Sequence, residues 1–127
     1  CETDHNYDMG SLFIHNDTWY VVAPTADGPQ HYGTGGEVVI WASQDRAERW
    51  VIKKQMTVNS PRNHAYVRRV LHGKAPFQFL WSDGNAESFS QARLYFGSLA
   101  GGMWELPYDM DQESVRPQQR ATVGYSQ

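Results

Sequence analysis

Ser43-Gln44-Asp45-Arg46-Ala47-Glu48-Arg49-Trp50 lies between two short runs of β-favouring residues, Glu37 to Ala42 and Trp50 to Met56. A short acidic side chain such as Asp45 can accept hydrogen bonds from the backbone amides of its own turn, and a Trp side chain can pack back between sheets. The sequence therefore predicts a hairpin in which Asp45 bonds to turn amides and Trp50 is substantially buried.

Eight short runs of this kind occur along the chain, each bounded by Gly, Pro, Asn, Asp or Ser. They are Ser11 to His15, Thr18 to Ala23, Glu37 to Ala42, Trp50 to Met56, Tyr66 to Val70, Phe77 to Ser82, Arg93 to Phe96 and Gly102 to Leu106. The link Asn16-Asp17 favours a two-residue hairpin, because Asn and Asp tolerate left-handed backbone. Pro24 to Gly36 is predicted to be a long surface loop. The pattern is typical of an all-β protein.

The two halves of the chain repeat the same order of features. Phe13 aligns with Val67, Trp19 with Phe77, Ser43 with Ser98 and Trp50 with Trp104. Four strands in each unit, repeated at this spacing, indicate two four-stranded antiparallel meanders of a β-propeller. A single eight-stranded sandwich with the same strand spacing is the alternative.

The run from Ser43 to Trp50 resembles the Asp box, S-x-D-x-G-x-T-W, of sialidase-like propellers, with Ala47 in place of Gly and Arg49 in place of Thr. In that family the box is a folding element away from the active site, so the resemblance gives Asp45 no catalytic role. Ser98 to Trp104 is a degenerate copy that keeps the Ser and the Trp.

A wider pattern resembles the later blades of BNR-repeat proteins, a family that includes sialidase-like proteins and is similar in fold to ulvan-type polysaccharide lyases. The residues that carry it are Asp4 to Asp8, Trp19, Ala23-Pro24-Thr25, Gly28-Pro29-Gln30, Gly35-Gly36-Glu37, Asn63 to Arg69, Trp81 to Gly84 and Ser90 to Phe96. The resemblance implies a partial propeller over residues 1–109, with blades at about 8–58 and about 63–107 and upstream blades missing from this sequence. Residues 110–127 are polar and are predicted to be a linker or a frayed tail.

Two clusters before or at the first strand of each unit are candidate catalytic residues: His5 with Tyr7, and His64 with Tyr66. In a propeller these segments converge on the central channel, where ligands bind. A phenol in such a channel can act as an acid, a base or a nucleophile. Blade packing with satisfied polar tips is the alternative role for His64 and Tyr66.

Arg68, Arg69 and Arg93 are the candidate substrate-binding residues. Tyr66 and Arg68 share one face of their strand because side chains alternate, and Arg69 faces the opposite way. A guanidinium can grip a sugar carboxylate with two parallel hydrogen bonds. Arg68 could instead tie neighbouring blades together, and Arg93 could pair with Glu37 or Asp83.

These residues favour a carbohydrate-active propeller that acts on acidic oligosaccharides or polysaccharides, as a sialidase-like glycoside hydrolase or as a polysaccharide lyase. A non-catalytic glycan-binding or scaffolding propeller is the alternative. The family resemblance favours an extracytoplasmic location, secreted or periplasmic.

Composition limits other functions. The net charge of −3 argues against nucleic-acid binding, and no apolar run approaches the roughly 20 residues of a membrane span. The single Cys cannot form an internal disulfide or build a structural zinc site alone. No recognised metal spacing links His5, His31 and His64, so no metal or cofactor is predicted. His15, at a hairpin tip, and His72 are expected to be solvated.

Overall fold

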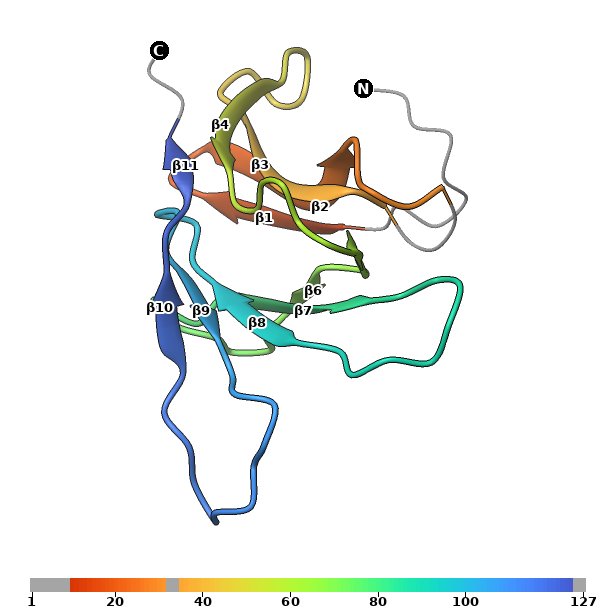
Figure 1. Cartoon of the computed structure of the whole chain (residues 1–127). Helices are drawn as coiled ribbons and strands as arrows, with labels where there is room; N and C mark the ends of the chain where they lie inside the picture. The colour runs from red at the N-terminus through yellow and green to blue at the C-terminus, as the bar shows by residue number, and fades with distance from the viewer. Residues whose placement is uncertain (1–9, 32–34, 125–127) are drawn as a thin grey trace.

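The structure is a computed structural model that describes residues 10–31 and 35–124. This part of the chain contains strands and no helix, and its strands form two antiparallel sheets that lie one over the other (Figure 1). The predicted all-β class is therefore confirmed.

The first sheet has the strand order β1-β2-β3-β4-β11. Its strands are β1 (Ser11–His15), β2 (Thr18–Ala26), β3 (Glu37–Ser43), β4 (Val51–Gln55) and β11 (Val123–Gly124). Asn16 and Asp17 have φ angles of 49° and 62° and join His15 to its partner Thr18, so the predicted two-residue hairpin is present.

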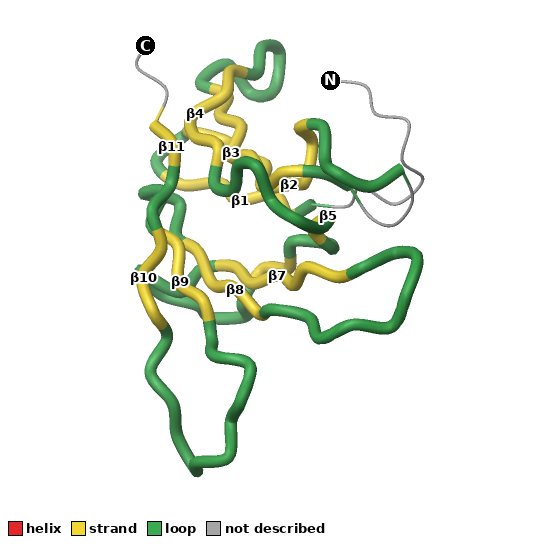
Figure 2. The backbone as a smooth tube through the Cα atoms, in the orientation of Figure 1, coloured by secondary structure: helices red, strands yellow, loops and turns green. Residues whose placement is uncertain are grey.

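The second sheet has the order β10-β9-β8-β7-β5, with β6 also paired to β7. Its strands are β5 (Asn63–His64), β6 (Arg68–Arg69), β7 (Phe79–Gly84), β8 (Leu94–Gly97), β9 (Met103–Glu105) and β10 (Gln118–Arg120). The predicted run Tyr66 to Val70 is thus only two paired residues long. The connections between β7 and β8 and between β9 and β10 extend away from the sheets as long loops (Figure 2).

The C-terminal segment corrects the expectation of a linker or frayed tail. β10 pairs with β9 and β11 pairs with β4, so this segment runs along one side of the molecule and adds a strand to both sheets (Figure 1). The side chains of Gln118 to Arg120 are exposed, and main-chain hydrogen bonds to a free sheet edge hold the segment. Hydrophobic periodicity could not reveal such strands.

The turn between β3 and β4 has the predicted hydrogen bonds. Asp45 Oδ1 accepts the Arg49 backbone N–H (2.9 Å) and the Ser43 hydroxyl (2.8 Å), and Ser43 Oγ accepts the Ala47 N–H (2.9 Å). These bonds, first the one from the Arg49 amide, lower the pKa of Asp45. Trp50 is only partly buried, so its predicted burial is met in part.

The same serine bond recurs in the turn between β8 and β9. Ser98 Oγ accepts the Gly102 N–H (3.1 Å), four residues further along the chain, as Ser43 does for its own turn. Gly101 takes the left-handed conformation here, with φ of 97°. The alignment of Ser43 with Ser98 is therefore reproduced in the hydrogen bonds.

The core lies between the two sheets. Phe13 of β1 contacts Phe79 of β7 (ring centroids 5.9 Å apart), and Trp81 stacks on Phe79 (5.9 Å) and on Tyr95 (5.2 Å). Gly97 lies beneath Phe79, where a Cβ atom would overlap the ring. The other buried members of this cluster are Val22, Val38, Ile40, Met56, Val67, Leu99 and Met103.

The backbone hydrogen bonds of the core residues in β3 show which face of the first sheet packs into the core. Val38 and Ile40 of β3 are core residues. The carbonyl of Val38 accepts the Met56 N–H (2.7 Å), so the backbone groups of these inward residues point to the β4 side. In a strand of L-residues, this direction fixes the face on which the side chain lies.

The inward residues of the second sheet point the other way. Tyr95 of β8 is a core residue, and the carbonyls of Arg93 and Gly97, two residues to either side, accept N–H groups from Asp83 (3.1 Å) and Gln78 (2.9 Å) on the β7 side. In both sheets the successive strands of the chain are neighbours, β1 to β4 in the first and β6 to β9 in the second. When the two sheets are viewed with these strands in the same order, opposite faces therefore enter the core, and the front of one sheet packs on the back of the other.

Candidate functional site

The structure describes five of the seven predicted site residues. His5 and Tyr7 lie outside the described residues. His64 belongs to β5, Tyr66 precedes β6, and Arg68 and Arg69 form β6. Arg93 directly precedes β8.

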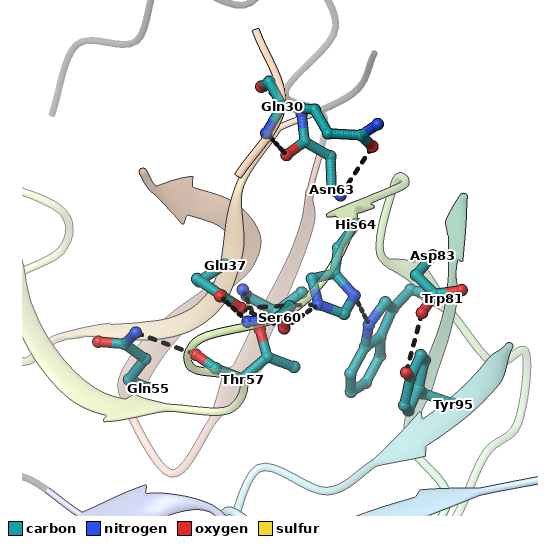
Figure 3. Close-up of polar contacts among 11 residues, drawn as sticks. Gln30, Glu37, Gln55, Thr57, Ser60, Asn63, His64, Trp81, Asp83 and Tyr95 are labelled. Atoms are coloured by element: carbon teal, nitrogen blue, oxygen red, sulfur yellow. Dashed lines mark hydrogen bonds and ion pairs between the residues drawn. The ribbon is translucent and has the colours of Figure 1, made fainter. Parts of the chain in front are cut away.

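His64 lies in a buried hydrogen-bond network between the two sheets (Figure 3). The Trp81 indole N–H donates to His64 Nδ1 (3.0 Å). His64 Nε2 lies 2.9 Å from Ser60 Oγ and 3.6 Å from Glu37 Oε2. Because Nδ1 accepts, a neutral ring carries its proton on Nε2, directed to Ser60 and Glu37.

Glu37 is the negative end of this network. Ser60 donates to it twice, from its backbone N–H and its hydroxyl, each at 2.7 Å. Burial raises the pKa of Glu37, but hydrogen bonds from His64, Thr57 and Ser60 outweigh burial and lower the pKa from 4.5 to about 2. The carboxylate is therefore ionised at neutral pH, and the network joins β3 through His64 to β7.

The network gives His64 a packing role. Both ring nitrogens have partners inside the protein, and the ring also contacts Tyr95 edge-on (centroids 5.6 Å apart). No described contact joins His64 to Tyr66 or Arg68. A catalytic role for His64 stays a prediction that this geometry does not favour.

Tyr66 and Arg68 form a pair, as the alternation of side chains predicts. The Arg68 guanidinium carbon lies 5.9 Å from the centroid of the Tyr66 ring. Arg68 is exposed and Tyr66 is half-buried. Within residues 10–31 and 35–124, no carboxylate lies within ion-pair distance of Arg68.

Arg69 faces away from this pair, also as predicted. Its guanidinium carbon lies 5.3 Å from the centroid of the Phe13 ring, on β1 of the first sheet. The side chains of the two neighbouring arginines of β6 therefore lie on opposite faces of the strand.

Arg93 lines a pocket of about 320 Å³. The pocket is lined by Met56, Thr57, Val58, Asn59, Ser60, Pro61, His64, Arg93, Tyr95, Met103, Glu105, Arg120 and Ala121. Arg93 Nε lies 3.4 Å from Glu105 Oε1, and Arg120 Nε donates to Glu105 Oε2 (2.6 Å). The structure thus brings His64 and Arg93 to one pocket, with two arginines held by one carboxylate.

The expected partner of Arg93 is corrected by this geometry. The side chain pairs with Glu105, whereas Asp83 accepts the backbone N–H of Arg93 (2.7 Å). Asp83 also accepts the Tyr95 hydroxyl (3.1 Å). Burial, together with the charge of Asp83, raises the pKa of Tyr95, so its phenol remains protonated.

Sequence reasoning did not identify Ser60, Trp81, Glu105 or Arg120 as members of these clusters. Each lies far along the chain from at least one partner, and Arg120 belongs to the segment expected to be a tail. Only knowledge of which strands pair could have shown that these residues lie close together.

Comparisons with protein families, with characterised proteins and with solved structures found no match for this chain. In the described part of the chain, no group of three or more His, Cys, Asp or Glu residues is arranged to hold a metal ion. No helix there is long and apolar enough to span a membrane.

Proposed function

We propose that this chain forms two adjacent blades of an extracytoplasmic β-propeller that acts on acidic glycans. The front-to-back packing of the two sheets supports the propeller, because the same contact can be repeated by further sheets around a ring. The repeated serine turn between the third and fourth strands of each sheet supports equivalent blades.

The outer face of each sheet carries a row of apolar side chains, as blades covered on both sides require. In the first sheet, one row of cross-strand partners is Leu12, Val21, Trp41 and Ile52. In the second, Leu80, Phe96 and Trp104 form the corresponding row, which begins at Arg68 on the edge strand β6, and the Phe77 ring packs on Phe96 and Trp104 (5.5 and 5.4 Å between centroids). Further blades of the same protein are the proposed cover for the apolar rows, whereas Arg68 lies on the edge strand β6, beside the covered part of this face.

The single observation that carries the glycan assignment is the pair of Tyr66 and Arg68. Arg68 holds a guanidinium at the edge of the second sheet with an aromatic ring beside it and no described carboxylate partner. A sugar carboxylate would supply that partner through two parallel hydrogen bonds, while the sugar ring packs on the aromatic side chain.

The proposed reaction is cleavage of the glycosidic bond next to this acidic sugar. In hydrolysis, the Tyr66 oxygen attacks the anomeric carbon, the glycosidic C–O bond breaks, and the leaving oxygen takes the proton given up by the phenol. Water then cleaves the Tyr–sugar bond, releases the sugar and returns a proton to the phenol oxygen. In elimination, a base removes the proton next to the carboxylate, a C=C bond forms and the leaving glycosidic oxygen takes a proton. Arg68 neutralises the carboxylate in both reactions.

Glycan binding without cleavage is the second candidate function. The observation that favours it is the burial of His64, whose ring nitrogens are both engaged by the protein. A binding propeller needs only Tyr66 and Arg68 at its surface.

The test compares Arg68→Ala and Tyr66→Phe with Arg116→Ala, an exposed arginine in the loop before β10. Substrates are a polyuronate and a sialylated oligosaccharide, and the readouts are glycan binding, released sugar and ultraviolet absorbance of an unsaturated uronate. We expect Arg68→Ala to weaken binding by roughly tenfold or more, the scale of a lost charged hydrogen bond, and Arg116→Ala to leave it unchanged.

The outcome for Tyr66→Phe separates the two functions. Under the enzyme proposal, this variant binds normally and turns over at least about a hundredfold more slowly. Binding without any cleavage by the wild-type protein that includes the further blades supports the second candidate. Wild-type binding and cleavage by both variants would show that the site is elsewhere.

A further inference from the structure

A second group of basic side chains surrounds a pocket at the β1–β2 hairpin. The pocket has a volume of about 210 Å³ and is lined by Phe13, Ile14, His15, Arg69, Val70, His72, Gly73, Gln78 and Leu99. Two segments contribute its basic groups: His15 ends β1, and Arg69 and His72 belong to the end of β6 and the turn that follows it. None of the described lining residues is acidic.

The remaining polar side chain of this pocket also offers donors. Gln78 Oε1 accepts the Leu99 backbone N–H (2.8 Å), so its NH₂ group is the end of the amide left to donate. The Arg69 guanidinium lies over the Phe13 ring. No described residue that lines the pocket supplies a carboxylate to pair with its charge.

The two histidines add ring N–H donors. His15 Nε2 lies 3.2 Å from Asn16 Nδ2, and when that amide donates, a neutral ring carries its proton on Nδ1. His72 has a φ angle of 55°, which places it in a tight turn closed by the Gly73 N–H bond to the Val70 carbonyl (3.0 Å). Both histidines are exposed, so neither is required by the core.

We propose that this pocket binds a tetrahedral oxyanion, the sulfate or phosphate group of a ligand. Arginine and imidazole groups donate to such anions, and the oxygens of a tetrahedral group point in enough directions to meet donors from both segments. The lone pairs of a carboxylate lie in one plane, so a planar carboxylate meets fewer of these directions. The pocket is separate from the Tyr66–Arg68 pair, because Arg68 and Arg69 face opposite sides of β6.

The test is a titration of the full chain with sodium sulfate and sodium phosphate at constant ionic strength, followed by the imidazole NMR signals. We expect saturable shifts of the His15 and His72 signals. Arg69→Gln should weaken binding by roughly tenfold or more, as expected for loss of a charged donor. Arg116→Gln, at an exposed position in the loop before β10, is the matched control, since it removes one positive charge outside the pocket, and it should leave binding unchanged.

Two exposed variants keep the proposal testable if Arg69→Gln impairs folding. His15→Gln and His72→Asn, the second chosen because Asn tolerates positive φ, should each weaken sulfate binding by a few-fold while near-ultraviolet circular dichroism stays unchanged. Wild-type binding by both variants would overturn the proposal.

Titrations with other anions identify the kind of ligand that the pocket binds. A sugar sulfate ester that binds more tightly than inorganic sulfate indicates an ester group as the ligand, and equal binding indicates the free anion; both support the pocket. Equally tight binding of acetate, an equal loss in Arg116→Gln, or no saturable binding of sulfate or phosphate would each contradict a tetrahedral oxyanion site.

Discussion

At the scale of single residues, Ser43 and Ser98 make the same hydrogen bond in two different turns. Each hydroxyl is buried and accepts the backbone N–H of the fourth residue along the chain. Asp45 adds its own bonds to the first turn, whereas Gly101 supplies left-handed backbone in the second. The serine, rather than the acidic residue, is therefore the element that the two turns share.

We expect Ser43→Ala and Ser98→Ala each to lower the free energy of unfolding by about 1–3 kcal/mol, because a turn amide loses its acceptor. Gln44→Ala, at an exposed position beside the first serine, should change it by less than about 0.5 kcal/mol. Urea denaturation of the three variants measures this. Equal effects of all three would show that the serine bonds contribute nothing specific.

Glu37 gives a pH-dependent prediction. Its folded pKa of about 2 is below the ordinary value of 4.5, so the unfolded chain binds more protons between these values. The stabilisation is complete above pH 4.5 and is lost as the pH falls towards 2, and it amounts to roughly 3 kcal/mol at 1.4 kcal/mol for each pH unit.

Unfolding free energies measured from pH 7 to 2 for the wild type and Glu37→Gln check this prediction. The wild type should lose more stability than the variant between pH 4.5 and 2. Parallel curves for the two proteins would mean that Glu37 is not the group that titrates there.

At the scale of strands, the second sheet depends on close approach of β8 to the Phe79 ring. Gly97 lies where a Cβ atom would overlap that ring, whereas Gly84, at the end of β7, has open space beside it. The two glycines thus differ in their surroundings, and neither has a positive φ angle.

Gly97→Ala should therefore destabilise the protein by about 1–3 kcal/mol through overpacking, and Gly84→Ala should have little effect. Thermal unfolding of both variants, followed by near-ultraviolet circular dichroism of the stacked Trp81, measures the difference. A stable Gly97→Ala variant with an unchanged aromatic spectrum would contradict the packing of β8 on Phe79.

At the scale of the whole molecule, both sheets carry apolar side chains on their outer faces as well as in the core between them. Leu12 and Ile14 of β1 are about half exposed, at 47% and 59%. Such surface favours association with other sheets, whether from further blades or from other copies in solution.

We therefore expect the isolated chain to associate or to be only partly ordered. Ile14→Lys should reduce association in analytical ultracentrifugation while leaving the free energy of unfolding almost unchanged, since Ile14 lies outside the core. Phe89→Ser, which removes a fully exposed ring from the β7–β8 loop, is the control. A monodisperse wild-type monomer with one sharp unfolding transition would contradict this expectation.

The sequence by itself determined the all-β class, the β1–β2 hairpin and the bond from a turn amide to Asp45. These features depend on backbone preferences and on neighbours within a few residues, which the order of amino acids specifies directly. The alternation that pairs Tyr66 with Arg68 and turns Arg69 away is equally local.

Only the tertiary structure decided where distant residues meet. In the structure His64 lies between Glu37 and Trp81, and Arg93 forms an ion pair with Glu105. A polar segment without periodicity forms the two strands β10 and β11. The tertiary structure also joined His15, Arg69 and His72 around one pocket. The physical reason is that these contacts arise from the packing of one sheet on another and from free main-chain groups at sheet edges, and neither leaves a pattern in the local sequence.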